Sequence, residues 1–224
     1  LVSKLAHQNV KVSLSGDAGD ELFCGYNRYI LTKRFWNKLS LLPKSLHCKL
    51  AKILINISPS TWSNLFGFLS QGTIGDKIHK AAGVLGSSTV DELYLGLISH
   101  WDNPGCIVLN STNPRTLLTD NMSDLSYMDP VHKMMLLDLM TCLPDDILTK
   151  VDRAAMGVSL ETRTPFLDHR VVEFAWHIPL SMKIRKGQGK WILRQLLYKY
   201  IPKELIERPK MGFGVPIGSW LRGP

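Results

Sequence analysis

Three carboxylates stand close together near the start of the chain, at Asp17, Asp20 and Glu21. They lie in or just after a turn of small residues, 15–19, whose backbone N–H groups can converge on one spot and attract an anion. Carboxylates repel phosphate, but Mg²⁺ removes the conflict, because one or two carboxylates hold it while phosphate oxygens and water complete its shell. The residues therefore predict a metal–phosphate site. The alternative is an ordinary strand–turn–helix with an acidic N-cap.

The sequence on either side of the turn predicts the elements that position it. Val10, Val12 and Leu14 alternate with polar residues, which is the period-two pattern of a half-buried strand. Acidic residues after a turn are typical of the first turn of a helix, so we expect a helix from Glu21 to about Leu39. The site would then lie where a strand ends and a helix begins.

Residues 15–26, SGDAGDELFCGY, resemble the second nucleotide motif of glutamine-dependent asparagine synthetases, S-G-[DE]-G-[SG]-D-E-[LV]-F-G-G-Y. Two later stretches resemble the same family: LPDDILTKVDRAAMGVSLETRTPFLD at 143–168 and GKWILRQLLYKYIPKELIERPKMGFGVP at 189–216. All three occur in the family's order, and residues 39–125 carry no matching motif. Ala18 and Cys24 stand where the family often has glycine, which alone accepts a positive φ freely.

The resemblance implies an ATP-dependent ligase that activates a carboxylate, that of aspartate, as an acyl-adenylate before ammonia attacks it. Ser15 and Gly16 match the residues that contact the nucleotide. Asp20 matches the Mg²⁺ ligand, and Asp17 matches a residue that affects formation of the adenylate. Lys210, in the loop Arg-Pro-Lys-Met-Gly-Phe, matches an active-site lysine, whose charge would neutralise the oxyanion of amide formation.

A tyrosine and a carboxylate are further candidates, because β-lactam-forming relatives of the family use such a pair as a proton-transfer dyad. Tyr26 aligns without a gap. Asp146 aligns only if one residue is inserted, so Asp152 is an alternative. We expect the stretch 161–168 to be structural, with Arg163 paired to an acid and Asp168 capping a helix.

The remaining patterns predict a mainly α-helical protein with a short β remnant. The resemblance makes this the C-terminal portion of an α/β synthetase domain of the adenine-nucleotide α-hydrolase-like (HUP) class, also called the ATP pyrophosphatase family. The Ser-Gly-Gly pyrophosphate loop and the glutaminase domain of the family do not occur in these 224 residues. We therefore expect residues 1–224 to be one partial domain, inactive in isolation. Further helices are expected over about 43–57, 74–82, 127–143, 169–177, 190–200 and 203–206, and another is expected to begin at Pro144. Ser60 or Thr61 can cap a short helix, and Thr89 with Glu92 has the spacing of a capping box at the start of one more. The methionines at 134, 135 and 140 are expected to pack in the core. A long loop is expected over 102–123 and a coil at the end.

The resemblance implies ATP and Mg²⁺ as cofactors, small-molecule substrates, and the glutaminase domain of the same chain as the ammonia source, in the cytoplasm. The net charge of +8 suits a polyanion such as a triphosphate. A nucleic-acid interface would need a basic stripe with interleaved aromatic residues, and residues 33–38, which come nearest, equally fit a solvated helix face. No apolar run approaches the ~18 residues of a membrane span.

Four widely spaced cysteines, with no CxxC pair, favour free thiols over a zinc site or disulfides. Two alternative functions stay open: a relative that amidates another carboxylate, such as a sugar acid on a surface polysaccharide, and a non-catalytic helical scaffold or binding piece. Binding of ATP with Mg²⁺ would discriminate between catalysis and scaffold. The sequence leaves the oligomeric state open, a homodimer included.

Overall fold

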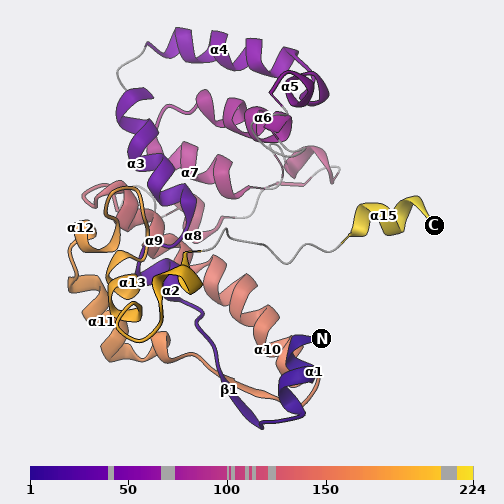
Figure 1. The fold of residues 1–224 in the computed structure, drawn as a ribbon. Helices are drawn as coiled ribbons and strands as arrows, with labels where there is room; N and C mark the ends of the chain where they lie inside the picture. Colours follow the sequence, from indigo (N-terminus) through magenta and orange to yellow (C-terminus); the bar gives the residue numbers. More distant parts are fainter. Residues whose placement is uncertain are drawn as a thin grey trace. The chain divides into compact units, whose positions relative to one another are not determined.

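A pair of short parallel strands marks the place where the chemistry-bearing turn begins (Figure 1). The computed structural model describes residues 1–39, 43–66, 74–99, 101, 104–108, 111–112, 115–120, 125–207 and 216–223. In it, β1 (Val12–Leu14) pairs with β2 (Glu161–Arg163), with Ser13 opposite Thr162. The Ser15 N–H donates to the Arg163 carbonyl at 2.8 Å, so the ladder continues into the turn.

The chain divides into two units, Leu1–Trp191 and Ile192–Pro224. Helices dominate the described residues, which confirms the predicted class of a mainly α protein with a short β component. The helices up to residue 98 are α1 (Val2–His7), α2 (Gly19–Leu22), α3 (Asn27–Leu39), α4 (Lys44–Asn56), α5 (Pro59–Phe66), α6 (Ile74–Leu85) and α7 (Val90–Ile98). The later ones are η2 (Pro104–Cys106), α8 (Leu117–Asp120), α9 (Pro130–Met140), the π-helix η3 (Leu143–Leu148), α10 (Thr149–Met156), η4 (Pro165–Leu167), α11 (His169–His177), α12 (Leu180–Lys183), α13 (Trp191–Leu197), α14 (Lys203–Ile206) and α15 (Ile217–Arg222). No helix of the described residues is long and apolar enough to cross a bilayer.

Several elements differ from the sequence-based expectations. The helix expected over 21–39 is broken into α2 and α3, because Cys24 adopts φ +58° between them. The expected half-buried strand exposes its apolar side: Val12 is 39% and Leu14 74% exposed, since a two-stranded sheet covers little of either face. The strand β2 and the helix α15 were not predicted, and the helix predicted to begin at Pro144 starts as the π-helix η3 before it continues as α10. Part of the expected loop over 102–123 lies outside the described residues, and η2 and α8 lie within it.

The principal core of the first unit joins α3, α7 and α9. Met134 and Met135 of α9 are buried, which confirms two members of the expected methionine core, whereas Met140 is 48% exposed. Straight-chain methionines fill irregular gaps well, and here they pack with buried aromatic and aliphatic side chains. That cluster comprises Cys24, Tyr29, Tyr94, Val131, Met134, Met135 and Leu137.

A buried carboxylate, Asp138 of α9, ties the three helices together. It has no exposed surface, and it accepts hydrogen bonds from the Arg28 Nη2 at 2.6 Å and from the Tyr94 hydroxyl at 2.8 Å. The Tyr29 hydroxyl donates to the same carboxylate. Burial and the Asp138 charge raise the pKa of both tyrosines, which therefore remain protonated donors. A buried charge is tolerated only when an opposite charge and hydrogen-bond donors compensate it, as Arg28 and the two tyrosines do here.

The second unit is held by one carboxylate of its own. Glu207 follows α14 and forms an ion pair with Arg194 of α13, Nη1 to Oε1 at 2.7 Å. The Tyr198 hydroxyl donates to the same Oε1 atom. These contacts fix the segment that leads into α14, which has the bounds that the sequence predicts.

Asp138→Ala should lower the free energy of unfolding by about 3–5 kcal/mol, because it leaves the Arg28 charge and two hydroxyls without their acceptor. Tyr94→Phe removes one donor and keeps the charge pair, so it should cost only about 1 kcal/mol. Urea unfolding followed by circular dichroism measures both. Equal losses in the two variants would show that Asp138 is not the centre of the network.

Candidate nucleotide and metal site

The turn at the carboxyl end of β1 has the backbone conformation that a glycine normally provides. Ala18, the N-cap of α2, adopts φ +68° and ψ −12°, in the left-handed region. An L-residue pays about 1–2 kcal/mol there. The Ser15 hydroxyl donates to the Asp17 carboxylate, which fixes the start of the turn. A Cβ at Gly16 would meet no atom within 4 Å, so the space beside Gly16 is open.

Asp20, on the first turn of α2, forms an ion pair with Lys190, Oδ2 to Nζ at 3.0 Å. Both side chains keep about a third of their surface exposed, at 34% and 29%. The Lys190 N–H also donates to the Phe23 carbonyl at 2.9 Å. Two glycines permit this approach, because a Cβ at Gly25 would overlap the Asp20 carboxylate and one at Gly189 would overlap the Cys24 carbonyl.

All three family-like stretches meet at this turn. The first supplies the turn itself, and the third begins with Gly189 and Lys190, which contact its backbone. The second supplies β2 and the ring of Phe166, whose centroid lies 5.7 Å from that of Phe23. Segments more than 100 residues apart in the sequence thus converge on the end of one strand.

Glu21 lies behind the turn and is almost fully buried, with 1% of its surface exposed. Burial is the main cause that raises its pKa, and a hydrogen bond from the Tyr26 hydroxyl, at 2.7 Å to Oε1, opposes the rise. Burial and this acceptor together raise the pKa of Tyr26. The Arg28 guanidinium lies 3.9 Å from the centroid of the Tyr26 ring. Tyr26 therefore acts as a donor that holds Glu21 in place.

The structure places the other sequence-predicted residues as follows. Asp146 lies in η3 and pairs with Lys150, Oδ2 to Nζ at 2.9 Å, with both side chains more than half exposed. Asp152, the alternative, lies in α10 with an exposed side chain. Within the described part of the chain, the Tyr26 hydroxyl thus forms its hydrogen bond with Glu21, and not with Asp146 or Asp152. Lys210 and residues 208–215 lie outside the described residues, so its place in the site stays a prediction.

The expectations for the stretch 161–168 are confirmed. The Arg163 Nε donates to the Glu161 Oε1 at 2.6 Å, and Asp168 accepts from the Arg170 N–H at 3.0 Å as the N-cap of α11. The Arg170 side chain and N–H hold the pKa of the exposed Asp168 carboxyl well below its ordinary value. These contacts are local and give the stretch a structural role beside the strand that it contains.

The carboxylates of the turn suit a magnesium ion shared with a phosphate. Asp17 and Asp20 offer oxygen ligands only, which Mg²⁺ prefers. The described residues contain no group of three or more His, Cys, Asp or Glu side chains that could enclose a metal by themselves. An ion held there would need other oxygens to complete its shell, as a bound nucleotide would supply.

Sequence reasoning missed Lys190 as a member of this constellation, and it missed that Glu21, one of the three carboxylates, is buried. Lys190 has a local signal, since Gly-Lys opens the third family-like stretch, but its partner is 170 residues away in the sequence. The burial of Glu21 follows from packing of α2 against α9. A second lysine, Lys183, is fully buried with no hydrogen-bond partner for its Nζ atom. Burial lowers its pKa.

Ala18→Gly should leave the free energy of unfolding within about 0.5 kcal/mol of the parent, because relief of the left-handed strain offsets the lost methyl and the added chain entropy. The matched control is Ala155→Gly, an equally buried alanine inside α10. It has no strain to relieve and should cost about 2 kcal/mol. Thermal and urea unfolding of both variants measure the difference. Equal losses would mean that position 18 is unstrained.

Comparison with known proteins bears on the whole chain. The model of the family described as Asparagine synthase matches residues 1–224. A putative glutamine-hydrolysing asparagine synthetase of Mycobacterium tuberculosis is 35% identical over 99% of this chain and 32% of its own length. Asparagine synthetase 1 of Bacillus subtilis is 34% identical over 99% of this chain and 33% of its own.

The Amidase chyE of Penicillium rubens is 25% identical over 97% of this chain and 34% of its own length. The chain thus spans about a third of the length of these relatives. No solved structure gives a significant match. The turn geometry, the convergence of three stretches and the match over every residue lead to one conclusion: the chain belongs to the asparagine synthase family.

Proposed function

We propose that the chain is one part of an ATP-dependent ligase that adenylates the side-chain carboxylate of aspartate and converts it to an amide with glutamine-derived ammonia. The observation that carries this proposal is the meeting of Asp20, Lys190 and an open, small-residue turn at the carboxyl end of β1. Loops at the carboxyl ends of parallel strands are where α/β folds bind nucleotides. Residues 1–224 would form one partial domain of a longer cytoplasmic protein that includes a glutaminase domain.

Each residue of the turn has a role in this proposal. Ser15 and Gly16 orient the nucleotide through the mouth of the turn, where the open space beside Gly16 admits it. Asp20, with Asp17 close by, would hold Mg²⁺, which supplies charge neutralisation for the leaving pyrophosphate when it is bound. Lys190 places a second positive charge beside Asp20 and opposes negative charge that develops there.

A second candidate is amidation of a different carboxylate, for example a sugar acid. The similarity to a relative named as an amidase favours this second candidate, because it indicates that related sequences carry out more than one reaction of amides. Product analysis in the protein that contains these residues with the rest of its synthetase domain decides the matter. Aspartate-dependent release of AMP with asparagine as product supports the first candidate. Release of AMP only with another carboxylate supports the second, and ADP as the nucleotide product contradicts both.

Asp20→Asn should abolish Mg²⁺-dependent ATP binding and adenylation while the protein stays folded. The variant removes a charged metal ligand, but the ion pair it breaks is partly exposed and contributes at most about 1 kcal/mol to stability. Calorimetric titration with ATP, with and without Mg²⁺, measures the effect. Asp76→Asn, an exposed acid on α6, is the control and should bind as the parent does. Near-parent turnover in Asp20→Asn would contradict the metal assignment.

Lys210→Ala should lower the rate of amide formation by about 10²–10³-fold, the usual loss when one oxyanion-stabilising group is removed. ATP affinity should change little, since Ser15, Gly16 and the metal carry it. The matched control is Lys199→Ala, an exposed lysine of the same unit. A variant that loses ATP affinity at unchanged turnover would make Lys210 a nucleotide clamp. If neither the ATP affinity nor the turnover changes, Lys210 is a surface lysine without a role in the reaction.

A further inference from the structure

The positive charge of the chain is concentrated in one stretch of helices. Residues 27–86 contain nine Lys or Arg side chains and one acidic residue, Asp76, an excess of eight that equals the net charge of the whole chain, +8. The other residues are balanced. Lys49 and Lys52 of α4 and Lys80 of α6 are exposed, and among the described residues none of the three forms an ion pair. The described fold thus gives these three lysines no ion pair, whereas Arg28 of the same stretch pairs with Asp138.

An apolar stripe runs along α4 beside these lysines. Leu46, Leu50 and Ile53 follow one another at spacings of four and three residues, and they are 41%, 40% and 58% exposed. The other face of the helix is the buried one, with His47 and Ala51. A helix of a globular protein normally turns such a stripe inward. Here the stripe faces outward, which is the arrangement of a helix that has a further partner.

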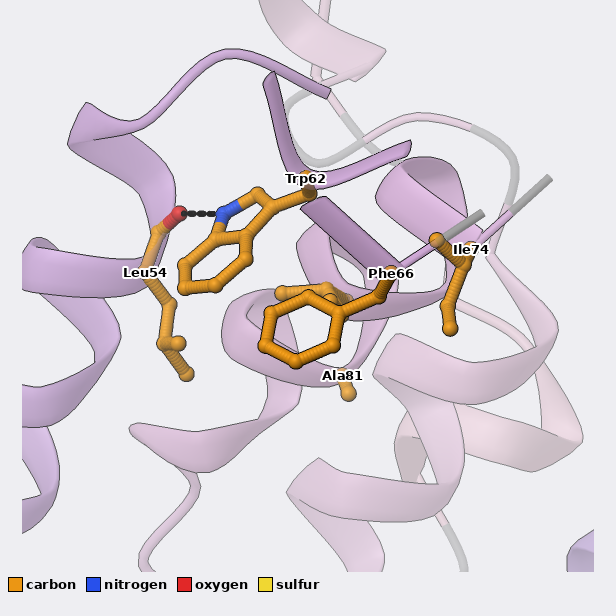
Figure 2. A pocket seen from close by; sticks show the side chains of 6 residues that line it. Leu54, Trp62, Phe66, Ile74 and Ala81 are labelled. Carbon is orange, nitrogen blue, oxygen red and sulfur yellow. Dashed lines mark hydrogen bonds between the residues drawn. The ribbon is translucent and has the colours of Figure 1, made fainter. Parts of the chain in front are cut away.

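A hollow of about 380 Å³ lies next to the stripe, between α4, α5 and α6 (Figure 2). Its walls are fixed: the Trp62 indole N–H donates to the Leu54 carbonyl at 3.0 Å, and the rings of Trp62 and Phe66 stack with centroids 5.8 Å apart. α6 packs against both other helices, which keeps the three walls together. Apolar side chains alone line the hollow: Leu54, Trp62, Phe66, Ile74, Ile78 and Ala81.

We propose that the outer surface of α4, α5 and α6 binds an acidic amphipathic helix of a partner protein. A bulky apolar side chain of that helix enters the hollow, its apolar neighbours cover Leu50 and Ile53, and its carboxylates lie against Lys49 and Lys52. Helix-in-groove recognition uses apolar anchors at such spacings. The buried anchor supplies most of the affinity, and the complementary charges speed association and select the partner.

Three other occupants fit the surface less well. A second copy of the chain would bring the exposed Lys49, Lys52 and Lys80 of one surface against those of the other, and like charges across an interface cost several kcal/mol. A nucleic acid would engage the lysines but leave the stripe and the hollow exposed to water, since phosphates offer nothing apolar. A flat membrane surface would cover the protruding stripe of α4 but leave the hollow lined by Trp62 and Phe66 unfilled.

The test uses a fluorescein-labelled helical peptide of about 18 residues, long enough for five turns. One face carries Glu, and the other carries Leu, Trp and Leu at helical spacings of four and three. The control peptide has the same composition in scrambled order. Fluorescence anisotropy with the chain at about 0.05 M and 0.5 M salt measures the affinity. The proposal expects binding of the patterned peptide alone, and weaker binding at the higher salt because the charges are screened.

Two double variants separate the charges from the apolar surface. Lys49→Glu with Lys52→Glu, and Leu50→Ser with Ile53→Ser, should each weaken peptide binding at least tenfold, equivalent to about 1.4 kcal/mol. All four side chains are exposed, so the fold does not depend on them. The matched control is Lys4→Glu with Lys11→Glu, which makes the same change in net charge at exposed positions outside the basic stretch. It should alter the affinity less than twofold.

Several results would overturn the proposal. Equal binding of the two peptides, no binding of either, or affinities of the two double variants within twofold of the parent would show that the surface does not select such a helix. A dimer in analytical ultracentrifugation that Leu50→Ser with Ile53→Ser dissociates would assign the surface to self-association. Binding to phosphatidylglycerol vesicles that Lys49→Glu with Lys52→Glu abolishes, without peptide binding, would assign it to a membrane.

Discussion

The candidate site depends on one close backbone approach, between residues 23–25 and residues 189–190. The Lys190 N–H reaches the Phe23 carbonyl at 2.9 Å, and a Cβ at Gly189 would overlap the Cys24 carbonyl. Only at this separation does the Lys190 ammonium meet Asp20. Any side chain at position 189 would separate the segments and remove the cation from the turn. The charge balance of the candidate metal–phosphate site therefore depends on a steric condition at a glycine.

The core behind the turn supplies the rigidity that this approach needs. α2 packs against α9, and α9 carries Asp138, which accepts from donors on α3 and α7. Arg28 connects the two regions, since its guanidinium bonds Asp138 and also lies over the ring of Tyr26, the residue that holds Glu21. A helix of four residues such as α2 is unstable by itself. Its orientation is set by these buried contacts and not by its own hydrogen bonds.

The elements that sequence reasoning predicted well are those with local signals. α11 has the predicted bounds because Asp168 caps it, and α7 begins after Thr89 because that hydroxyl accepts from the Glu92 N–H. The candidate turn was likewise predictable, since its small residues and acids are contiguous. β2 was missed because a polar three-residue segment becomes a strand only by pairing with β1. The Asp20–Lys190 pair and the outward face of α4 are also products of contacts, or of missing contacts, far along the chain.

Conformational strain is concentrated where the chemistry is proposed. Five non-glycine residues of the described part of the chain have a positive φ. Three of them, Ala18, Cys24 and Lys190, belong to the turn or to the segment that packs against it. Each costs about 1–2 kcal/mol relative to glycine. The Nζ atom of the buried Lys183 lies 5.3 Å from the centroid of the Trp176 ring and has no hydrogen-bond partner, which adds a further cost in the first unit. Such costs persist only where surrounding packing over-determines the conformation, and here the Asp138 core and the Gly189 approach do so. The site is thus a strained turn kept in one geometry by its neighbours, which is the condition for fixing charges before a substrate arrives.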